Sequence, residues 1–383
     1  MNSPPESLVG QGVQAIDTPA LVIDLDVMER NLFKMAAFAA AHGVKLRPHA
    51  KMHKCAALAL LQIEAGAVGV CVQKTSEAIT MAAGGVNDIY ISNEVVAPHK
   101  LQRVAQLHQM LAARGGKLAI AVDSLHGIRA LAQSLPLLPP PATTLDVFVE
   151  LDVGHGRCGV NSSEAVLALA TEISAHPQLR FAGLQAYQGR AQHLRSVPER
   201  QAATHTALDR IGHACALLAS CGLPSQLVTG AGTGSFGEEA ASGIYGELQA
   251  GSFIFMDADY ARNEPDPRQP QFEQALFIKT AVMSVSEAHA VCDAGHKSHA
   301  IDSGLPRVHG ADLEYLNGGD EHGMLRTRDA EGRLPTLGDV LWLIPGHCDP
   351  TVNLHDAMVG VRGGLARGVI ERIFTVDARG ALT

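Results

Sequence analysis

Leu145-Asp-Val-Phe-Val-Glu-Leu-Asp-Val-Gly-His-Gly-Arg157 is an apolar run that ends abruptly in glycines and polar residues. Its first half is typical of a buried strand, and its second half is typical of a loop. Seven further runs of this kind lie between residues 44 and 250, separated by stretches of helical character. They are Val44–Ala50, Gly69–Gln73, Asp88–Ser92, Lys117–Asp123, Arg180–Ala186, Gln226–Gly230 and Glu247–Ala250. Eight alternating units of strand and helix predict a (β/α)8 barrel, an α/β fold.

Local signals support the alternation. Two long amphipathic segments, Ala97–Arg114 and Val197–Ser220, are predicted as helices between barrel strands. The sequence Asn161-Ser-Ser-Glu164 resembles a capping box, with Asn161 as the cap. Asn263-Glu-Pro-Asp-Pro267 is predicted to be a linker or a lid loop.

After Phe253 the pattern changes, because strand-like runs follow one another with few helical stretches between them. The runs are Phe272–Glu287, Ala288–Ala294, Val340–Ile344, Ala357–Val361 and Val369–Val376. They predict a second, β-rich domain. Leu21–Leu25 is also strand-like and precedes the first barrel unit. We therefore expect a barrel over residues 18–256 and a β-rich domain over 257–383, with residues 18–26 pairing with the β-rich domain.

Composition excludes several classes of protein. The 383 residues carry a formal charge of −9 without any run of Lys and Arg, so we expect no nucleic-acid partner. Met1–Gln14 lacks the pattern of an export signal, and no stretch reaches about 18 uninterrupted apolar residues, so we expect no membrane association. Seven scattered cysteines without CxxC pairs suggest reduced thiols in the cytoplasm.

Lys51 lies just after the first predicted barrel strand, in Arg47-Pro-His-Ala-Lys51-Met-His53. Active-site residues of such barrels lie on the loops that follow the strands. A lysine that is partly desolvated there has a lowered pKa, and its free amine can form a Schiff base with an aldehyde. The alternative is a solvated lysine at the end of a strand.

Gly230-Ala-Gly-Thr-Gly-Ser235 follows the seventh strand and offers backbone N–H groups that can converge on a phosphate. The hydroxyl groups of Thr233 and Ser235 add two more donors. Phosphate sites in such barrels gather after strands seven and eight, where Gly251-Ser252 is placed to contribute. A tight turn without a ligand is the alternative, and a dinucleotide site is disfavoured because the third glycine of GxGxxG is absent.

His347-Cys-Asp349 is the strongest local signal. In an extended segment side chains alternate, so His347 and Asp349 face the same way and Cys348 points opposite. One nitrogen and one carboxylate oxygen, completed by water, suit Mn²⁺, Mg²⁺ or Co²⁺. The alternative is a simple His–Asp hydrogen bond at a turn before Pro350, and no third protein ligand can be identified.

Two further polar residues follow predicted strands. His193 is placed after strand six, where an imidazole can act as a general base. Arg157 follows strand five and can pair with a phenolate or a carboxylate. The ordinary alternatives are a structural histidine and a surface salt bridge.

These motifs, in this order, resemble the D-threonine aldolase family of fold-type III pyridoxal-phosphate enzymes, over almost the whole chain. The segments that carry the resemblance are Thr18-Pro-Ala-Leu-Val-Ile-Asp-Leu, Leu46-Arg-Pro-His-Ala-Lys51-Met-His-Lys, Val72-Gln-Lys-Thr-Ser-Glu-Ala, Ile91-Ser-Asn-Glu, Gly154-His-Gly-Arg-Cys-Gly-Val, Gly183-Leu-Gln-Ala-Tyr, Gly230-Ala-Gly-Thr-Gly-Ser, Phe255-Met-Asp-Ala-Asp-Tyr, Asp320-Glu-His-Gly and His347-Cys-Asp-Pro-Thr-Val-Asn-Leu-His-Asp.

The resemblance implies an alanine racemase-like architecture and a homodimer whose active sites form between the barrel of one subunit and the β-rich domain of the other. It implies a retro-aldol reaction that splits a β-hydroxy-D-amino acid, such as D-threonine or D-allo-threonine, into glycine and an aldehyde. It also implies that Lys51 forms the Schiff base with pyridoxal 5'-phosphate, with His193 near the substrate hydroxyl. The divalent metal, Mn²⁺ above all, is implied to bind His347 and Asp349 in the β-rich domain. The implied cofactor-binding residues are Lys51, Arg157, Tyr187, Gly232, Thr233, Gly234, Ser235, Gly251 and Ser252.

Three relatives of this family remain as alternatives. A 3-hydroxy-D-aspartate aldolase shares the reaction and differs in the β-substituent. Gly304-Leu-Pro306 and Lys51-Met-His53 resemble that branch, whereas Leu46-Arg-Pro-His-Ala-Lys51 resembles the threonine branch. A D-serine dehydratase typically has a His-x-Cys zinc pair, whereas this chain has Asp349 at the second position, which favours aldol cleavage over β-elimination. A non-catalytic carrier of pyridoxal phosphate lacks the β-rich C-terminal region, so residues 272–383 count against it.

Overall fold

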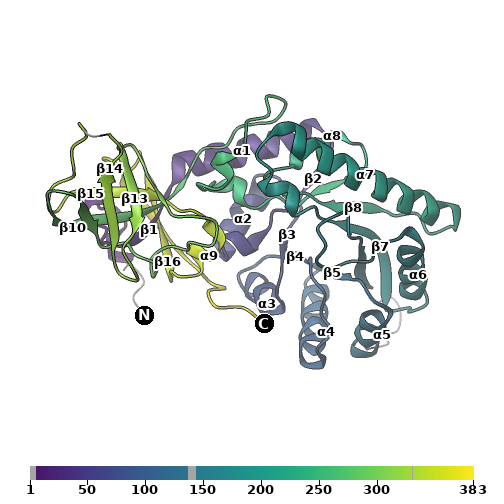
Figure 1. Ribbon diagram of the computed structural model, residues 1–383. Coiled ribbons are helices and arrows are strands. Elements are labelled where there is room, and N and C mark those ends of the chain that lie inside the picture. The colour runs from purple at the N-terminus through teal and green to yellow at the C-terminus, as the bar shows by residue number, and fades with distance from the viewer. Residues whose placement is uncertain (1–5, 137–143, 330) are drawn as a thin grey trace.

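Eight parallel strands form the barrel in the computed structural model, which describes residues 6–136, 144–329 and 331–383 (Figure 1). The sheet runs in the order β2-β9-β8-β7-β6-β5-β4-β3. Its strands are β2 Lys45–Leu46, β3 Val70–Val72, β4 Asp88–Ile91, β5 Lys117–Val122, β6 Leu145–Glu150, β7 Leu179–Ala186, β8 Leu227–Gly230 and β9 Glu247–Leu248. The N–H groups of Val68 and Cys71 donate to the carbonyl oxygens of Leu46 and Pro48, which joins the two ends of the sheet. The predicted (β/α)8 barrel is therefore confirmed.

Helices cover the outside of the barrel. They are α1 Leu25–Ala41, α2 Ala56–Glu64, α3 Thr75–Ala83, α4 Pro98–Ala113, α5 Leu125–Ser134, α6 Ser163–Ser174, α7 Val197–Ser220 and α8 Phe236–Ala241. The two helices predicted from periodicity, α4 and α7, are confirmed. The predicted cap of α6 is wrong by one residue. The hydroxyl of Ser162, and not the side chain of Asn161, accepts the hydrogen bond from Ala165 N at 3.2 Å.

A second, mostly antiparallel sheet follows the barrel in sequence. Its strands are β1 Ala20–Asp24, β10 Leu276–Val285, β11 Ala290–Cys292, β12 Arg307–Val308, β13 Leu313–Asn317, β14 Gly323–Thr327, β15 Val340–Ile344, β16 Ala357–Arg362 and β17 Val369–Thr375, with the short helix α9 Cys348–Val352 after β15. The N-terminal strand β1 lies inside this sheet, antiparallel to β10 and parallel to β16. The chain therefore enters through the β-rich domain before it forms the barrel.

Three strands of the β-rich domain were not predicted, namely β12, β13 and β14. In β13 the buried Leu313 and Tyr315 alternate with the exposed Glu314 on a strand that ends the sheet. Such short edge strands carry charged residues and few apolar ones, so their sequence signal is weak. The predicted strand Phe272–Glu287 is also too long at its start, because β10 begins at Leu276.

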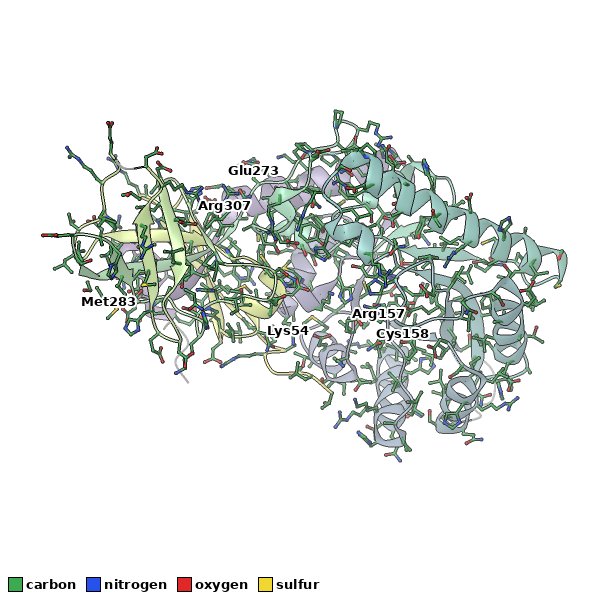
Figure 2. All side chains as sticks on the ribbon, in the orientation of Figure 1. Lys54, Arg157, Cys158, Glu273, Met283 and Arg307 are labelled. Carbon is green, nitrogen blue, oxygen red and sulfur yellow. The ribbon has the colours of Figure 1, made fainter. Side chains whose placement is uncertain are left out.

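The two domains share an apolar core and are also tied by hydrogen bonds. One cluster of buried side chains includes Met35 of α1, Phe253 after β9 and Phe374 of β17. Lys54 lies where the domains meet (Figure 2), and its carbonyl oxygen accepts from Ala378 N at 2.9 Å. The loop that follows β2 is therefore held against the segment that follows β17.

None of the helices in the described part of the chain is long and apolar enough to cross a membrane.

Candidate active site

A pocket lies at the carboxyl ends of the barrel strands, where such barrels place their active sites. Its volume is about 790 Å³, including the solvent space at its open mouth. Loops after seven barrel strands reach it, and the end of β15 closes one side. The lining residues are His49, Lys51, Met52, Gln73, Ser92, Arg157, Gln185, Tyr187, His193, Ala231, Gly232, Thr233, Gln249, Gly251, Ser252, Tyr260, His347 and Asp349.

Lys51 lies on a single 3-10 turn, Ala50–Met52, directly after β2. Its Nζ is 3.6 Å from Asp349 Oδ2, and 42% of the side chain is exposed. Burial lowers the pKa of Lys51, but the negative charge of Asp349 outweighs it, and the pKa lies above its ordinary value. The sequence did not reveal that a carboxylate from the other domain lies beside this amine.

His347 and Asp349 both line the pocket, but the extended segment predicted for them is wrong. His347 caps α9 and Asp349 is in its first turn, where Pro350 is also tolerated. Cys348 is fully buried and points away, with its Sγ donating to Met256 O at 3.4 Å. The short helix therefore puts the histidine and the carboxylate on one side, as the alternation argument expected, through a different geometry.

The pair meets the distance requirement of a chelate. His347 Nε2 lies 3.8 Å from Asp349 Oδ1, and two ligand atoms that each lie about 2.1 Å from one cation are at most about 4.2 Å apart. Asp349 Oδ1 is buried and lacks a hydrogen-bond partner among the described residues. The other ring nitrogen, His347 Nδ1, lies 2.6 Å from Asp302 Oδ2. No group of three His, Cys, Asp or Glu suited to a metal occurs in the described ranges, so the remaining ligands would be water or substrate.

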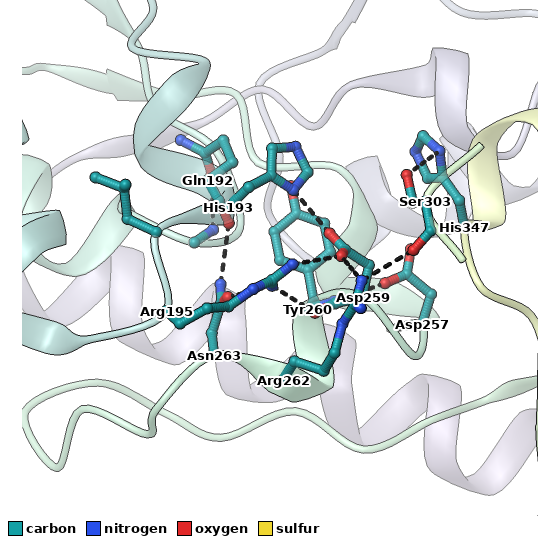
Figure 3. Close-up of polar contacts among 12 residues, drawn as sticks. Gln192, His193, Arg195, Asp257, Asp259, Tyr260, Arg262, Asn263, Ser303 and His347 are labelled. Carbon is teal, nitrogen blue, oxygen red and sulfur yellow. Dashed lines mark hydrogen bonds and ion pairs between the residues drawn. The ribbon is translucent and has the colours of Figure 1, made fainter. Parts of the chain in front are cut away.

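His193 ends the 3-10 turn Arg190–His193 after β7, and its ring faces the pocket. Its Nδ1 lies 2.7 Å from Asp259 Oδ2, so Nε2 is the free ring nitrogen. The ring also stacks on Tyr260, with centroids 6.1 Å apart. Figure 3 shows His193, Arg195 and Arg262 converging on Asp259.

The glycine-rich loop after β8, which was predicted to bind a phosphate, contributes part of its length to the pocket wall. Gly232 and Thr233 line the pocket together with Gly251 and Ser252. The Oγ1 of Thr233 is buried and has no hydrogen-bond partner within the described chain. A Cβ on Gly232 would lie 2.3 Å from Gln192 Oε1, so the site has no room for a side chain there.

Gly234 and Ser235 have other partners and do not line the pocket. The N–H of Gly234 donates to Gln192 Oε1 at 2.8 Å, and the hydroxyl of Ser235 donates to Glu239 at 2.8 Å. Glu239 is fully buried, and burial raises its pKa to about 8. Of the four residues from Gly232 to Ser235 that were predicted to surround a phosphate, Gly232 and Thr233 line the pocket and Gly234 and Ser235 do not.

Arg157 and Tyr187 lie next to each other on the far wall of the pocket. The guanidinium carbon of Arg157 is 5.9 Å from the centre of the Tyr187 ring. Burial raises the pKa of Tyr187, although the positive charges of Lys51 and Arg157 oppose the rise. This wall can offer a cation and a phenol to an aromatic ligand that reaches Lys51.

Three carboxylates of the site were not predicted. Asp259 holds His193, and Asp302 holds His347. The buried Asp257 accepts a hydrogen bond from Cys348 N at 3.2 Å and so fixes the turn between His347 and Asp349. Burial raises the pKa of Asp257 to about 6, although hydrogen bonds from two backbone N–H groups lower it. The sequence pointed to Asp257 and Asp259, because both belong to the family-like motif Phe255-Met-Asp-Ala-Asp-Tyr260. No motif pointed to Asp302.

Comparison with known proteins gives two family matches. Residues 23–259 match the alanine racemase N-terminal domain, and residues 275–361 match a putative serine dehydratase domain. A 3-hydroxy-D-aspartate aldolase of Paracoccus denitrificans (strain Pd 1222) is 44% identical, over 98% of this chain and 95% of that protein. A D-threonine aldolase of an Arthrobacter species is 44% identical, over 98% of this chain and 96% of that protein. The crystal structure of D-threonine aldolase from Filomicrobium marinum superimposes with a TM-score of 0.92 at 43% identity, covering 98% of this chain and 99% of that one.

Proposed function

Because the chain belongs to the alanine racemase-like family that includes the D-threonine and 3-hydroxy-D-aspartate aldolases, we propose that its pocket cleaves β-hydroxy-D-amino acids into glycine and an aldehyde. The enzyme is then a carbon–carbon lyase. The observation that carries the proposal is that Lys51 and the His347–Asp349 pair line the same pocket. Lys51 Nζ lies 3.6 Å from Asp349 Oδ2.

The residues on the barrel side fit pyridoxal phosphate. The amine of Lys51 is the group that would hold it covalently, and the unpaired Thr233 hydroxyl is a phosphate donor. Gly232, Gly251 and Ser252 line the same pocket as Thr233, and side chains at the two glycines would collide with Gln192 and His49, so only glycine fits at these positions. The bound cofactor supplies an electron sink for the carbanion that forms at Cα when the Cα–Cβ bond breaks.

The residues on the β-rich side fit a divalent cation. His347 and Asp349 would hold it, and Asp302 would orient the ring of His347 through Nδ1. A nitrogen, a carboxylate and water are a hard ligand set, so we propose Mn²⁺, with Mg²⁺ or Co²⁺ as substitutes. The buried thiol of Cys348 points away from the pocket, which argues against a soft thiolate site. The bound cation supplies a Lewis acid for the β-hydroxyl of the substrate.

His193 takes the next step. Its Nε2 faces the pocket and accepts the proton of the β-hydroxyl as the Cα–Cβ bond breaks and the aldehyde forms. Water in the same pocket would be the alternative acceptor for the same proton. Tyr260 packs against the imidazole and keeps it from turning away from the pocket.

We also propose that the enzyme is a cytoplasmic homodimer. The seven free cysteines suit a reducing compartment. The pocket is open beside His193, whose side chain is 53% exposed, and a second subunit would cover it. Sedimentation of the purified protein at about 40 kDa, the mass of one chain, would contradict the dimer.

The function is tested by product analysis. Purified protein is incubated with pyridoxal phosphate, MnCl₂ and, separately, D-threonine, D-3-hydroxyaspartate and D-serine. We expect glycine with acetaldehyde from the first substrate, or glycine with glyoxylate from the second, and the faster of the two identifies the β-substituent. Keto acid and ammonia without glycine would refute the aldolase and favour β-elimination.

A further inference from the structure

Asp259 lies behind His193, outside the lining of the pocket, and its side chain is only 5% exposed. Three side chains donate to it, two from the loop after β7 and one from its own 3-10 turn. His193 Nδ1 is 2.7 Å from Oδ2, Arg195 Nη2 donates to Oδ1 at 2.6 Å, and Arg262 also donates to Oδ1 (Figure 3). The two carboxylate oxygens therefore have different partners. Oδ1 accepts from both guanidinium groups, and Oδ2 is bonded to the imidazole.

The two arginines fix the protonation state of this carboxyl. Burial raises the pKa of Asp259, but the hydrogen bonds from Arg195, His193 and Arg262 outweigh it, so the pKa lies below its ordinary value. An ionised carboxylate can only accept hydrogen bonds. The proton in the 2.7 Å contact therefore belongs to Nδ1 of His193, and in the neutral imidazole the lone pair is on Nε2.

The backbone around Asp259 connects this arrangement to the other half of the pocket. Ala258 N donates to Pro345 O at 2.9 Å, and Asp259 N donates to Gly346 O at 3.2 Å. Gly346 directly precedes His347. The segment that carries Asp259 is thus bonded to the strand end that carries the metal pair, which fixes the position of His193 relative to His347.

We propose that Asp259 is the positioning residue of the reaction. Its carboxylate selects the Nδ1–H tautomer of His193 and so makes Nε2 the proton acceptor for the β-hydroxyl. This inference rests on the proposed role of His193. General bases contribute about 10²- to 10⁴-fold to a rate, and this contribution is lost when the ring presents the wrong nitrogen.

The test uses Asp259→Asn, which keeps the shape and leaves an oxygen for the arginines but presents an NH₂ group to Nδ1. We expect kcat/KM for the preferred β-hydroxy-D-amino acid to fall at least about 100-fold, mostly in kcat, with the cofactor absorbance unchanged. Asp266→Asn is the matched control. Its carboxylate is 7% exposed and bound by Arg268 in the same loop, but it does not contact His193, so kcat/KM should stay within about two-fold.

A double-mutant cycle separates positioning from general damage. If Asp259 acts through His193, then Asp259→Asn in the His193→Gln background lowers kcat/KM by less than about three-fold. A loss as large as in the wild-type background would overturn the proposal. Full activity of His193→Gln alone would instead show that the base itself is wrongly assigned.

The tautomer is measured without substrate. In ¹⁵N spectra of histidine-labelled protein, His193 is identified as the signal absent from His193→Gln. We expect a protonated Nδ1 and an unprotonated Nε2 in the neutral wild-type ring, and the reverse pattern in Asp259→Asn. A wild-type ring that carries its proton on Nε2 would overturn the proposal whether or not the variants fold.

Discussion

Replacing Thr233 with valine should weaken cofactor binding without weakening the fold. The Thr233 hydroxyl is buried in the pocket wall and has no partner in the described chain, whereas an anionic phosphate there would accept from it. A hydrogen bond to a charged group contributes about 1.5–3 kcal/mol. At about 1.4 kcal/mol per factor of ten, the Kd of pyridoxal phosphate should rise about 10- to 150-fold.

The stability of the apoprotein should change in the opposite direction. A buried hydroxyl without a partner costs about 1–3 kcal/mol, and Thr→Val removes that cost while keeping the volume. Thr280→Val is the matched control, because Thr280 is also buried but donates to Asp293 at 2.6 Å in the β-rich domain. It should destabilise the apoprotein by about 1.5–3 kcal/mol and leave cofactor affinity unchanged.

The assay combines titration of the apoprotein with pyridoxal phosphate, followed by absorbance, with urea unfolding of both apo variants. A Kd for Thr233→Val within about two-fold of the wild type would refute the placement of the phosphate at this loop. So would a stability loss as large as that of Thr280→Val, because it would show that the Thr233 hydroxyl already has a partner in the protein.

Two further predictions concern the barrel and its pH dependence. Arg47→Met should lower the free energy of unfolding by about 3–5 kcal/mol in urea, because it leaves the buried carboxylate of Glu247 without its ion pair; a loss under about 1 kcal/mol would contradict this. Burial raises the pKa of Glu239 from its ordinary 4.5 to about 8, so the folded state binds the proton more tightly and stability falls as pH rises between these values. Glu239→Gln should flatten that fall, and an unchanged slope of stability against pH would show that Glu239 is already ionised at neutral pH.

The barrel could be predicted because its signal is local and repeated. Runs such as Lys117–Asp123 and Leu145–Asp152 are buried between the barrel interior and the helices, and this requires a continuous apolar composition. The β13–β14 hairpin lies at the end of a sheet, where half of each strand faces solvent and charged residues are favoured. Its pattern resembles an ordinary polar loop.

The site could be predicted in part for the same reason. Lys51, His193 and Gly232 each follow a barrel strand, so the topology alone brings them to one end of the barrel. Their partners could not be predicted, because Asp259 is 66 residues from His193 and Asp349 reaches Lys51 from the other domain. The same limit explains Gly234, whose N–H is taken by Gln192 from the loop after β7.

We propose that one half of the pocket holds the cofactor and that the other half is needed to break the carbon–carbon bond. The measurement that tests it most directly compares Lys51→Ala with Asp349→Ala, recording the absorbance of the lysine-bound cofactor and the release of glycine from D-threonine and from D-3-hydroxyaspartate. We predict that Lys51→Ala loses both signals, whereas Asp349→Ala, like the chelator-treated wild type, keeps the cofactor band and loses at least about 99% of glycine release. Full glycine release after exhaustive chelation, or an unchanged cofactor band in Lys51→Ala, would contradict the account.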